Sequence, residues 1–310
     1  YHTLLADLHD ASADGNRPWT LTLCGKEGLN TVTARVLIDA TGDANAFTLA
    51  GLPVRRSDTR QPATLMFRLE NVDWNRVAPE PLRNAAAEAR RNGRLRPGDL
   101  GSHQADIVGF LRSSGENRMH LPGADGETSP TRSQAETAAR ETLLRILRFL
   151  RAQPGLETVH LKRCAPECGI RETVRIRGRA TITGADYSSG RYWPDALCYS
   201  FYPIDIHRAD GDGIDIRPLA HGTVPTIPRD ALVPEKQSWI RAAGRCISGD
   251  RTAHSAYRVQ ATCMATGQAA GALAALAAQT RTPPQNLPLH DVRTRLQNAG
   301  TILPTPPPNP

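Results

Sequence analysis

Lysine is almost absent from this sequence of 310 residues, and no run of basic residues occurs in it. Only three of its 38 basic side chains are lysines, and the arginines that produce the net charge of +7 are scattered along the chain. A nucleic-acid-binding face is typically a cluster of lysine and arginine. The sequence therefore predicts no nucleic-acid partner, and the arginine bias indicates the base composition of the source genome.

Cysteine is scarce too, and long hydrophobic runs are missing. The closest two of the six cysteines, Cys164 and Cys168, have a C-x3-C spacing that differs from the paired spacing of a zinc site. We expect free thiols, no metal and a cytoplasmic location, because the N-terminus also lacks a signal peptide.

The Gly267-x3-Gly271 spacing occurs in membrane dimers, but glutamine and threonine interrupt that stretch, which argues against a membrane helix.

The pattern of apolar residues predicts an α/β protein. The run at 36–38 is typical of a strand that is buried on both faces in a parallel sheet. Apolar residues spaced by three and four predict helices, and a proline-rich composition after Thr280 predicts a loose tail. The expected strands are 20–24, 31–42, 65–71, 159–163, 173–183, 199–206 and 239–243, and the expected helices are 43–51, 85–91, 133–153 and 258–278.

Two stretches carry residues suited to binding a ligand. In IDATGD, a buried strand is followed by Thr41, Gly42 and Asp43, and glycine there allows a ligand to approach the backbone at a helix N-terminus. An ordinary strand-to-helix turn would have the same pattern. In the second stretch, Gly249 and Asp250 follow another expected strand, and an aspartate there can accept hydrogen bonds from ligand hydroxyls.

The helix expected after the second stretch has an unusual surface. Its small residues fall on one face, so we expect another element or a ligand to approach it closely, and its N-terminus favours an electron-rich group. The face consists of Gly267, Ala270, Gly271, Ala274, Ala275 and Ala278.

Four segments together resemble the successive C-terminal blocks of the FAD-dependent oxidoreductases with a glutathione-reductase-like fold. They are ARVLIDATGDANAFTLAGLPV, CGIRETVRIRGRATITGADY, YPIDIH and AGRCISGDRTAHSAYRVQATCMATGQAAGALAAL, in that family's order. The resemblance covers about residues 32–278. It implies an α/β fold in which an incomplete Rossmann-type FAD-binding domain carries an inserted α+β substrate domain.

The resemblance also implies domain bounds and cofactor contacts. Residues 1–60 and 237–282 would form the FAD-binding part, 61–236 the inserted substrate or cap domain, and 283–310 a proline-rich tail. The turn Thr41–Gly42–Asp43 would lie near the adenosine, and the pair Gly249–Asp250 beside the ribityl chain. Arg258 would serve the flavin carbonyls or the phosphates. The residues expected to pack against the isoalloxazine and ribityl are Val259, Gln260, Gly267 and Gln268.

One element of the family pattern is missing. The phosphate-binding GxGxxG occurs nowhere in this sequence, which begins at Tyr1 rather than at a methionine. We therefore expect a truncated sequence, or a subunit that a complementing chain completes, and weak FAD binding by this chain alone.

Four residues are the candidates for catalysis. The resemblance places Arg171 and Glu172 at the border of the active site, where Arg171 would hold an anionic substrate and Glu172 would orient it; a structural ion pair is the alternative. His207 and His254 are candidates for proton transfer, because histidine titrates near neutral pH. For both, a structural role is the alternative.

Three functions fit these observations. The first is an FAD-dependent oxidoreductase, or its C-terminal portion, that transfers a hydride between flavin and a small organic substrate. An anionic substrate is one version of this function. The alternative is a non-catalytic subunit or binding protein that retains the flavoprotein fold. The second alternative is an RNA-modifying flavoprotein, which the basic charge favours slightly.

Overall fold

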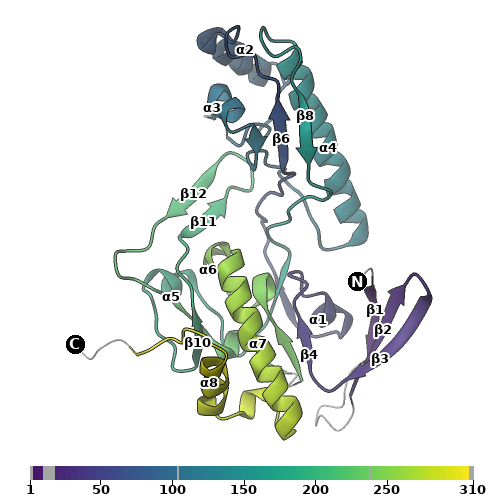
Figure 1. Cartoon of the computed structure of the whole chain (residues 1–310), viewed down its shortest axis with the longest axis vertical. Helices are drawn as coiled ribbons and strands as arrows, with labels where there is room; N and C mark the ends of the chain where they lie inside the picture. The colour runs from purple at the N-terminus through teal and green to yellow at the C-terminus, as the bar shows by residue number, and fades with distance from the viewer. Residues whose placement is uncertain (1–2, 10–17, 103–104, 237–238, 307–310) are drawn as a thin grey trace. The chain divides into compact units, whose positions relative to one another are not determined.

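The chain folds into two compact units. The structure, a computed structural model, describes residues 3–9, 18–102, 105–236 and 239–306. Unit 1 comprises Tyr1–Ser57, Val174–Asp205 and Ile216–Pro310, and unit 2 comprises Asp58–Thr173 and Ile206–Asp215 (Figure 1). The predicted insertion, 61–236, thus overlaps unit 2 only at 61–173 and 206–215. Both units mix helices and small sheets, and the described residues contain eight α-helices.

A three-stranded antiparallel sheet opens unit 1. It consists of β1 (Leu4–His9), β2 (Trp19–Gly25) and β3 (Gly28–Ala34), in the order β1-β2-β3. The β2–β3 hairpin is in register as far as the pair Gly25 and Gly28. Gly28 has a φ of 105°, which a residue with a side chain rarely adopts. The strand expected at 20–24 is therefore present, and a tight turn joins it to β3. The strand expected at 31–42 is divided between β3 and a second strand, Leu37–Asp39, which belongs to another sheet.

A parallel pair of strands brings the two ends of the chain together in unit 1. Strand β4 (Leu37–Asp39) pairs with β14 (Ile240–Ala242), and Asp39 lies opposite Ala242. The strand is thus paired in parallel, as predicted, but the apolar run at 36–38 is half-buried and not buried on both faces. Because the strands are parallel, the turns that follow both of them begin at one edge of the sheet.

Helix α7 (Gln260–Thr280) packs on this strand pair and on β10 (Ala196–Tyr199). Figure 1 shows α7 running beside these strands. The helix expected at 258–278 is therefore present as α7, shifted by two residues. The preceding segment, expected as a loop, contains a further helix, α6 (Arg251–Tyr257). By length and composition alone, α7 is apolar enough to cross a membrane, but the core helix of a soluble protein passes the same test.

Short elements complete unit 1. They are α1 (Asn45–Leu49), β5 (Val54–Arg56) paired with β9 (Val174–Ile176), α5 (Gly184–Ser188), β13 (Thr226–Pro228) paired with β10, the 3-10 turns Arg229–Ala231, Gly244–Cys246 and Pro284–Asn286, and α8 (Leu289–Asn298). The strand expected at 173–183 is limited to β9. The expected loose tail is wrong over α8, because Val292 and Leu296 are buried there and the helix packs on α7. Residues 307–310 of that tail lie outside the described residues.

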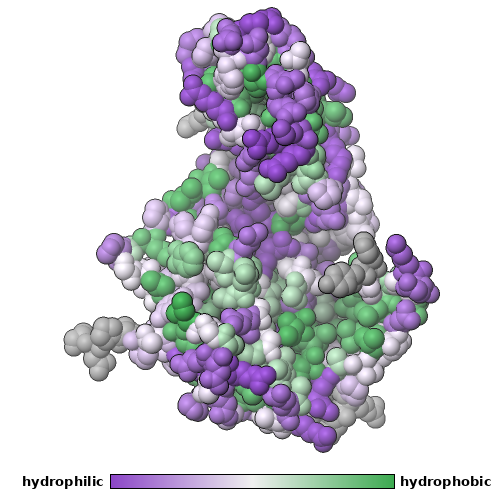
Figure 2. Space-filling model, viewed as in Figure 1, coloured by the Kyte–Doolittle hydropathy of each residue, from purple (hydrophilic) through white to green (hydrophobic). Residues whose placement is uncertain are grey.

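Unit 2 is built around a second antiparallel sheet with helices beside it. Strand β6 (Phe67–Glu70) lies between β7 (Gly115–Glu116) and β8 (His160–Cys164), and α4 (Ser129–Arg151) runs beside β8 in Figure 1. Helices α2 (Pro79–Arg91) and α3 (Ile107–Arg112) share its hydrophobic core. Strands β11 (Ile204–His207) and β12 (Ile214–Arg217) form a two-stranded sheet. Figure 2 shows hydrophilic residues over most of the visible face around α2 and α4.

Candidate functional site

The turn after β4 is held by one buried carboxylate. Asp39, which is 1% exposed, accepts hydrogen bonds from the backbone N–H and the hydroxyl of Thr41 at 3.0 and 2.7 Å. Its second oxygen accepts from the N–H groups of Ala46 and Phe47 at 2.9 and 3.3 Å. A carboxylate at a helix N-terminus satisfies amides that the helix leaves unpaired. Asp39 therefore fixes both the turn and the start of α1, although the sequence pointed to Thr41–Asp43.

An arginine from the second predicted stretch binds the same turn. Arg245 donates to the carbonyl oxygen of Gly42 at 2.9 Å, and it forms an ion pair with Asp43 at 2.5 Å. Gly42 has a φ of 77°, and a Cβ at this position would lie 2.9 Å from the Arg245 guanidinium. The segment that follows β14 therefore contacts the turn that follows β4 at the end of the parallel strands. Their charged side chains neutralise each other.

Gly249 and Asp250 also have partners within the protein. Asp250 caps α6 by accepting from Ala253 N–H, and its other oxygen accepts from Gly184 N–H, each at 2.8 Å. A Cβ on Gly249 would lie 2.5 Å from the Tyr257 hydroxyl oxygen. The glycine is thus required by the packing of Tyr257, and the aspartate acts as a helix cap.

The N-terminal end of α7 has no such partner. Val259 occupies the N-cap position, where valine supplies no hydrogen-bond acceptor, and no side chain from the described residues caps the helix. The first turn of this 21-residue helix therefore offers backbone N–H groups and a partial positive charge. Gln260 is exposed in this first turn, and Gln268 is exposed about two turns further along the helix.

The buried face of α7 differs from the predicted one. The core receives Thr262, Thr266, Ala269, Ala270, Leu273 and Ala277. Of the predicted small-residue face, only Ala270 is buried, because Leu273 fills the core and the Thr266 hydroxyl accepts a hydrogen bond from Gly244 N–H at 3.0 Å. A Cβ on Gly267 or on Gly271 would meet nothing within 4 Å among the described residues. Of the two neighbours expected for this face, another element of this chain thus fully covers only Ala270.

Two further candidates lie in unit 1. Arg258 forms an ion pair with Asp205 at 3.6 Å and donates to the Asp205 carbonyl at 3.3 Å, and both side chains are mostly buried. His254 is 1% exposed and meets Tyr257 edge to face, with ring centroids 5.6 Å apart. Burial and the nearby Arg175 guanidinium hold the pKa of His254 well below its ordinary value. His254 is therefore neutral near pH 7.

The remaining catalytic candidates lie in unit 2, where two of them share one partner. Glu172 is completely buried and accepts hydrogen bonds from the backbone and side-chain N–H groups of Gln61 at 3.2 and 3.4 Å. The Gln61 side-chain oxygen accepts from the backbone N–H of His207 at 3.1 Å. Both Glu172 and His207 therefore bind Gln61, although they lie 111 and 146 positions from it in the sequence.

His207 has a second histidine as its partner. Its Nδ1 lies 3.0 Å from Nε2 of His120, and Nδ1 of His120 lies 3.2 Å from the carbonyl oxygen of Gly211. A carbonyl only accepts, so His120 carries its proton on Nδ1, and its Nε2 must accept from Nδ1–H of His207. Desolvation and then the charge of His207 lower the pKa of His120 to about 4. Near pH 7 His120 is therefore neutral.

Arg171 is bonded to the polypeptide in the same unit. Its guanidinium is buried and donates to the Pro62 carbonyl and the Thr64 hydroxyl, both at 2.7 Å, and to the Asn117 side chain at 3.5 Å. These bonds hold the segment that carries Gln61. Arg171 and Glu172 thus each bind a different part of the 61–64 segment.

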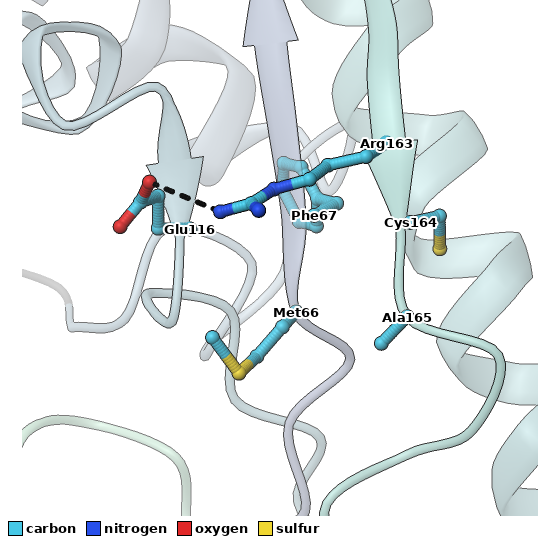
Figure 3. Close-up of a pocket in the computed structure, with 6 residues that line it drawn as sticks. All are labelled: Met66, Phe67, Glu116, Arg163, Cys164 and Ala165. Atoms are coloured by element: carbon cyan, nitrogen blue, oxygen red, sulfur yellow. Dashed lines mark ion pairs between the residues drawn. The ribbon is translucent and has the colours of Figure 1, made fainter.

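Two cavities of unit 2 lie near charged side chains. A cavity of ≈ 360 Å³ is lined by His120, Asp99 and Arg145, among others. Another, of ≈ 250 Å³, lies on the β6–β8 sheet. Arg163 and Glu116 form an ion pair at 3.8 Å there, and Figure 3 shows Met66 below this pair and Cys164 beside it. Burial raises the pKa of the Cys164 thiol, so it is a poor nucleophile. The first cavity contains a member of the histidine pair.

The structure therefore groups the predicted residues into two sets. Arg171, Glu172 and His207 lie in unit 2, while His254 and every predicted cofactor residue lie in unit 1. Four further residues, which were not among the predicted ones, hold the members of each set in place. They are Asp39 and Arg245 in unit 1 and Gln61 and His120 in unit 2. Asp39 and Arg245 stand inside recognisable motifs, whereas nothing in the sequence near Gln61 or His120 marks them.

Comparison with known proteins identifies one family. The model of a family described as FAD dependent oxidoreductase matches residues 1–296. No curated protein and no solved structure matches the chain.

Proposed function

This chain belongs to the FAD-dependent oxidoreductase family, and we propose that it transfers a hydride between flavin and a small organic anion. The family binds FAD. When bound, the flavin supplies two-electron chemistry, and the protein binds, orients and protonates the substrate. The observation that carries the proposal is the uncapped end of α7 beside the edge where β4 and β14 end.

The first half of α7 fits a flavin. The backbone N–H groups of its first turn suit an electron-rich carbonyl edge, and further along the helix the open space over Gly267 and Gly271 admits a flat ring close to the backbone. We propose that Val259, Gln260 and Gln268 line this surface. The turns Thr41–Asp43 and Gly249–Asp250 would form the adjoining wall through their backbone, because their side chains are bonded elsewhere.

We propose that unit 1 is the Rossmann-type part of the fold and that the inserted segment supplies the substrate side. The pairing of β4 with β14, from opposite ends of the chain, supports this division. All six cysteines are free thiols, which supports a reducing compartment such as the cytoplasm.

On the substrate side, the proposal assigns proton transfer to Nε2 of His207. Nδ1–H of His207 donates to His120, so we assign proton exchange with the substrate to the other ring nitrogen. Gln61 and Glu172 fix the backbone of His207. In this scheme Arg171 positions the 61–64 segment, because its guanidinium donates hydrogen bonds to Pro62 and Thr64. Its positive charge would attract an anionic substrate without direct contact.

Equilibrium titration of the purified chain with FAD tests the cofactor part. We expect saturable binding that is weak, because no GxGxxG loop contributes its amides. Gly271→Leu should abolish it by filling the space over α7, whereas Gln279→Leu, at the exposed far end of the same helix, should not. A folded chain that takes up no FAD at millimolar concentration would overturn the proposal. Flavin uptake with no substrate-dependent reduction would instead indicate the non-catalytic binding protein.

A further inference from the structure

A groove along α4 in unit 2 combines positive charge with apolar surface. It has a volume of ≈ 640 Å³, within the range of sites for small organic ligands. Four guanidinium groups line it, two from the loop after α2 and two from α4, together with one carboxylate, that of Glu141. The arginines are Arg94, Arg96, Arg145 and Arg148.

The charges of these arginines are unequally compensated. Arg145 forms a two-pronged ion pair with Asp99, whose carboxylate is 2% exposed, so its charge is neutralised. Arg94 lies 3.6 Å from Glu88 on the surface. Among the described residues, neither Arg96 nor Arg148 has an ion-pair partner. The groove therefore retains an excess of positive charge even after Glu141 is counted.

The apolar part comes from the same helix face. Glu141, Leu144 and Arg148 are spaced by three and four, so they lie on one side of α4. Leu144 leaves 50% of its surface exposed, unlike Leu143, Leu147 and Leu150, which are buried on the core side. With the Phe149 ring and the methylene stems of the arginines, Leu144 gives the groove an apolar wall.

We infer that this groove binds a small organic anion that has a phosphate or carboxylate head and an apolar body. Arg96 and Arg148 would bind the head, because guanidinium pairs with such oxyanions in a two-pronged geometry. Leu144 and Phe149 would cover the body and remove its apolar surface from water.

A long polyanion fits the groove less well. Elsewhere on α4, Arg132 and Arg140 are both paired with Glu136, and Arg132 also reaches Glu167. Arg151 donates to the carbonyl oxygen of Val159 at 2.7 Å. The uncompensated charge is thus confined to the groove instead of extending along the helix, as a nucleic-acid backbone would require.

Competition with a fluorescent dye tests the ligand class. The purified full chain is titrated with 8-anilinonaphthalene-1-sulfonate, and octyl phosphate is added below its micelle concentration. We expect octyl phosphate to displace the dye at concentrations at least about tenfold lower than inorganic phosphate or 1-octanol, because each of these lacks half of the recognised chemistry. Equal potency of inorganic phosphate would overturn the inference, as would a tighter displacement by a single-stranded oligonucleotide.

Variants locate the effect in the groove. The double variant Arg96→Gln/Arg148→Gln should weaken octyl phosphate about tenfold or more, and Leu144→Gln should weaken it several-fold without changing inorganic phosphate. The matched control, Arg68→Gln/Arg112→Gln, removes the same charge from other exposed sites of unit 2. All variants change exposed side chains, and circular dichroism checks their fold. Unchanged affinity in the groove variants, or an equal loss in the control, would place the ligand elsewhere and refute the site. The inference does not depend on flavin binding.

Discussion

The two sets of candidate residues are built in different ways. In unit 1, the cofactor-side turns are held by bonds within a few residues, such as Asp39 to Thr41, and by one arginine from the second turn. In unit 2, the substrate-side residues are held by long-range bonds, from Gln61 to Glu172 and from His207 to His120. The first arrangement leaves its mark in short motifs, whereas the second leaves none. Each set should therefore respond differently to substitution.

The largest expected effect is in the cofactor-side turn. Asp39→Ala should lower the free energy of unfolding by about 3–4 kcal/mol, because it leaves the N–H groups of Thr41, Ala46 and Phe47 without their acceptor. Urea unfolding of the full chain measures this. Asp43→Asn, which weakens a more exposed pair with Arg245, is the control and should cost about 1 kcal/mol or less. Similar losses in both variants would mean that Asp39 is no more important than a surface residue.

The difference between local bonds in unit 1 and long-range bonds in unit 2 explains which parts of the fold and of the site the sequence could predict. Strand β4, the turn Thr41–Asp43 and the helical character of 260–280 follow from local patterns, and the structure contains them. Helix α4 begins four residues before the expected Ser133, because Thr128 and Thr131 form a capping box that the apolar pattern does not register. Partners such as Gln61 have no periodic or spacing signal, since folding alone brings them together.

The buried face of α7 was mispredicted for a related reason. Small residues at helical spacing mark a face that something can approach, but they do not say whether that is the chain itself. In this chain the core takes the neighbouring face with Leu273 and Thr266, since larger side chains remove more apolar surface from water.

The substrate-side network should give the second largest effect, and it should depend on pH. The pKa of His120 is lowered to about 4 in the folded chain, from an ordinary value of 6.5, so the unfolded chain binds the proton more tightly. The contribution of His120 to the free energy of unfolding is therefore fully present above pH 6.5 and is lost as the pH falls towards 4. The loss is at most about 3 kcal/mol. Urea unfolding at several pH values should show this slope. His120→Asn should flatten it and His290→Asn, at an exposed position, should not; a slope retained in His120→Asn would assign it to other groups.

A smaller effect is expected at the second cofactor-side turn. Gly249→Ala should destabilise the chain by about 1–3 kcal/mol, because the new Cβ would lie 2.5 Å from the Tyr257 hydroxyl oxygen. Tyr257→Phe in the same chain should recover part of this loss, despite the hydrogen bond from Tyr257 to the Ile247 carbonyl. Additive losses in a double-mutant cycle would show that this contact is not the reason for glycine at 249.

The smallest expected change is a gain in stability, at a glycine in the middle of a helix. It contrasts with the loss expected at the turn glycine, Gly249. Gly267→Ala should stabilise the chain by about 0.5–1 kcal/mol, because alanine loses less backbone entropy in a helix and its Cβ meets nothing within 4 Å. If a flavin lies on this face, the same methyl group should weaken FAD binding, so that stability rises while affinity falls. Urea unfolding and FAD titration of one variant measure both quantities. A gain in stability with unchanged FAD affinity would mean that the ring does not lie over Gly267, and a loss of stability would mean that this glycine faces an unseen partner within the chain.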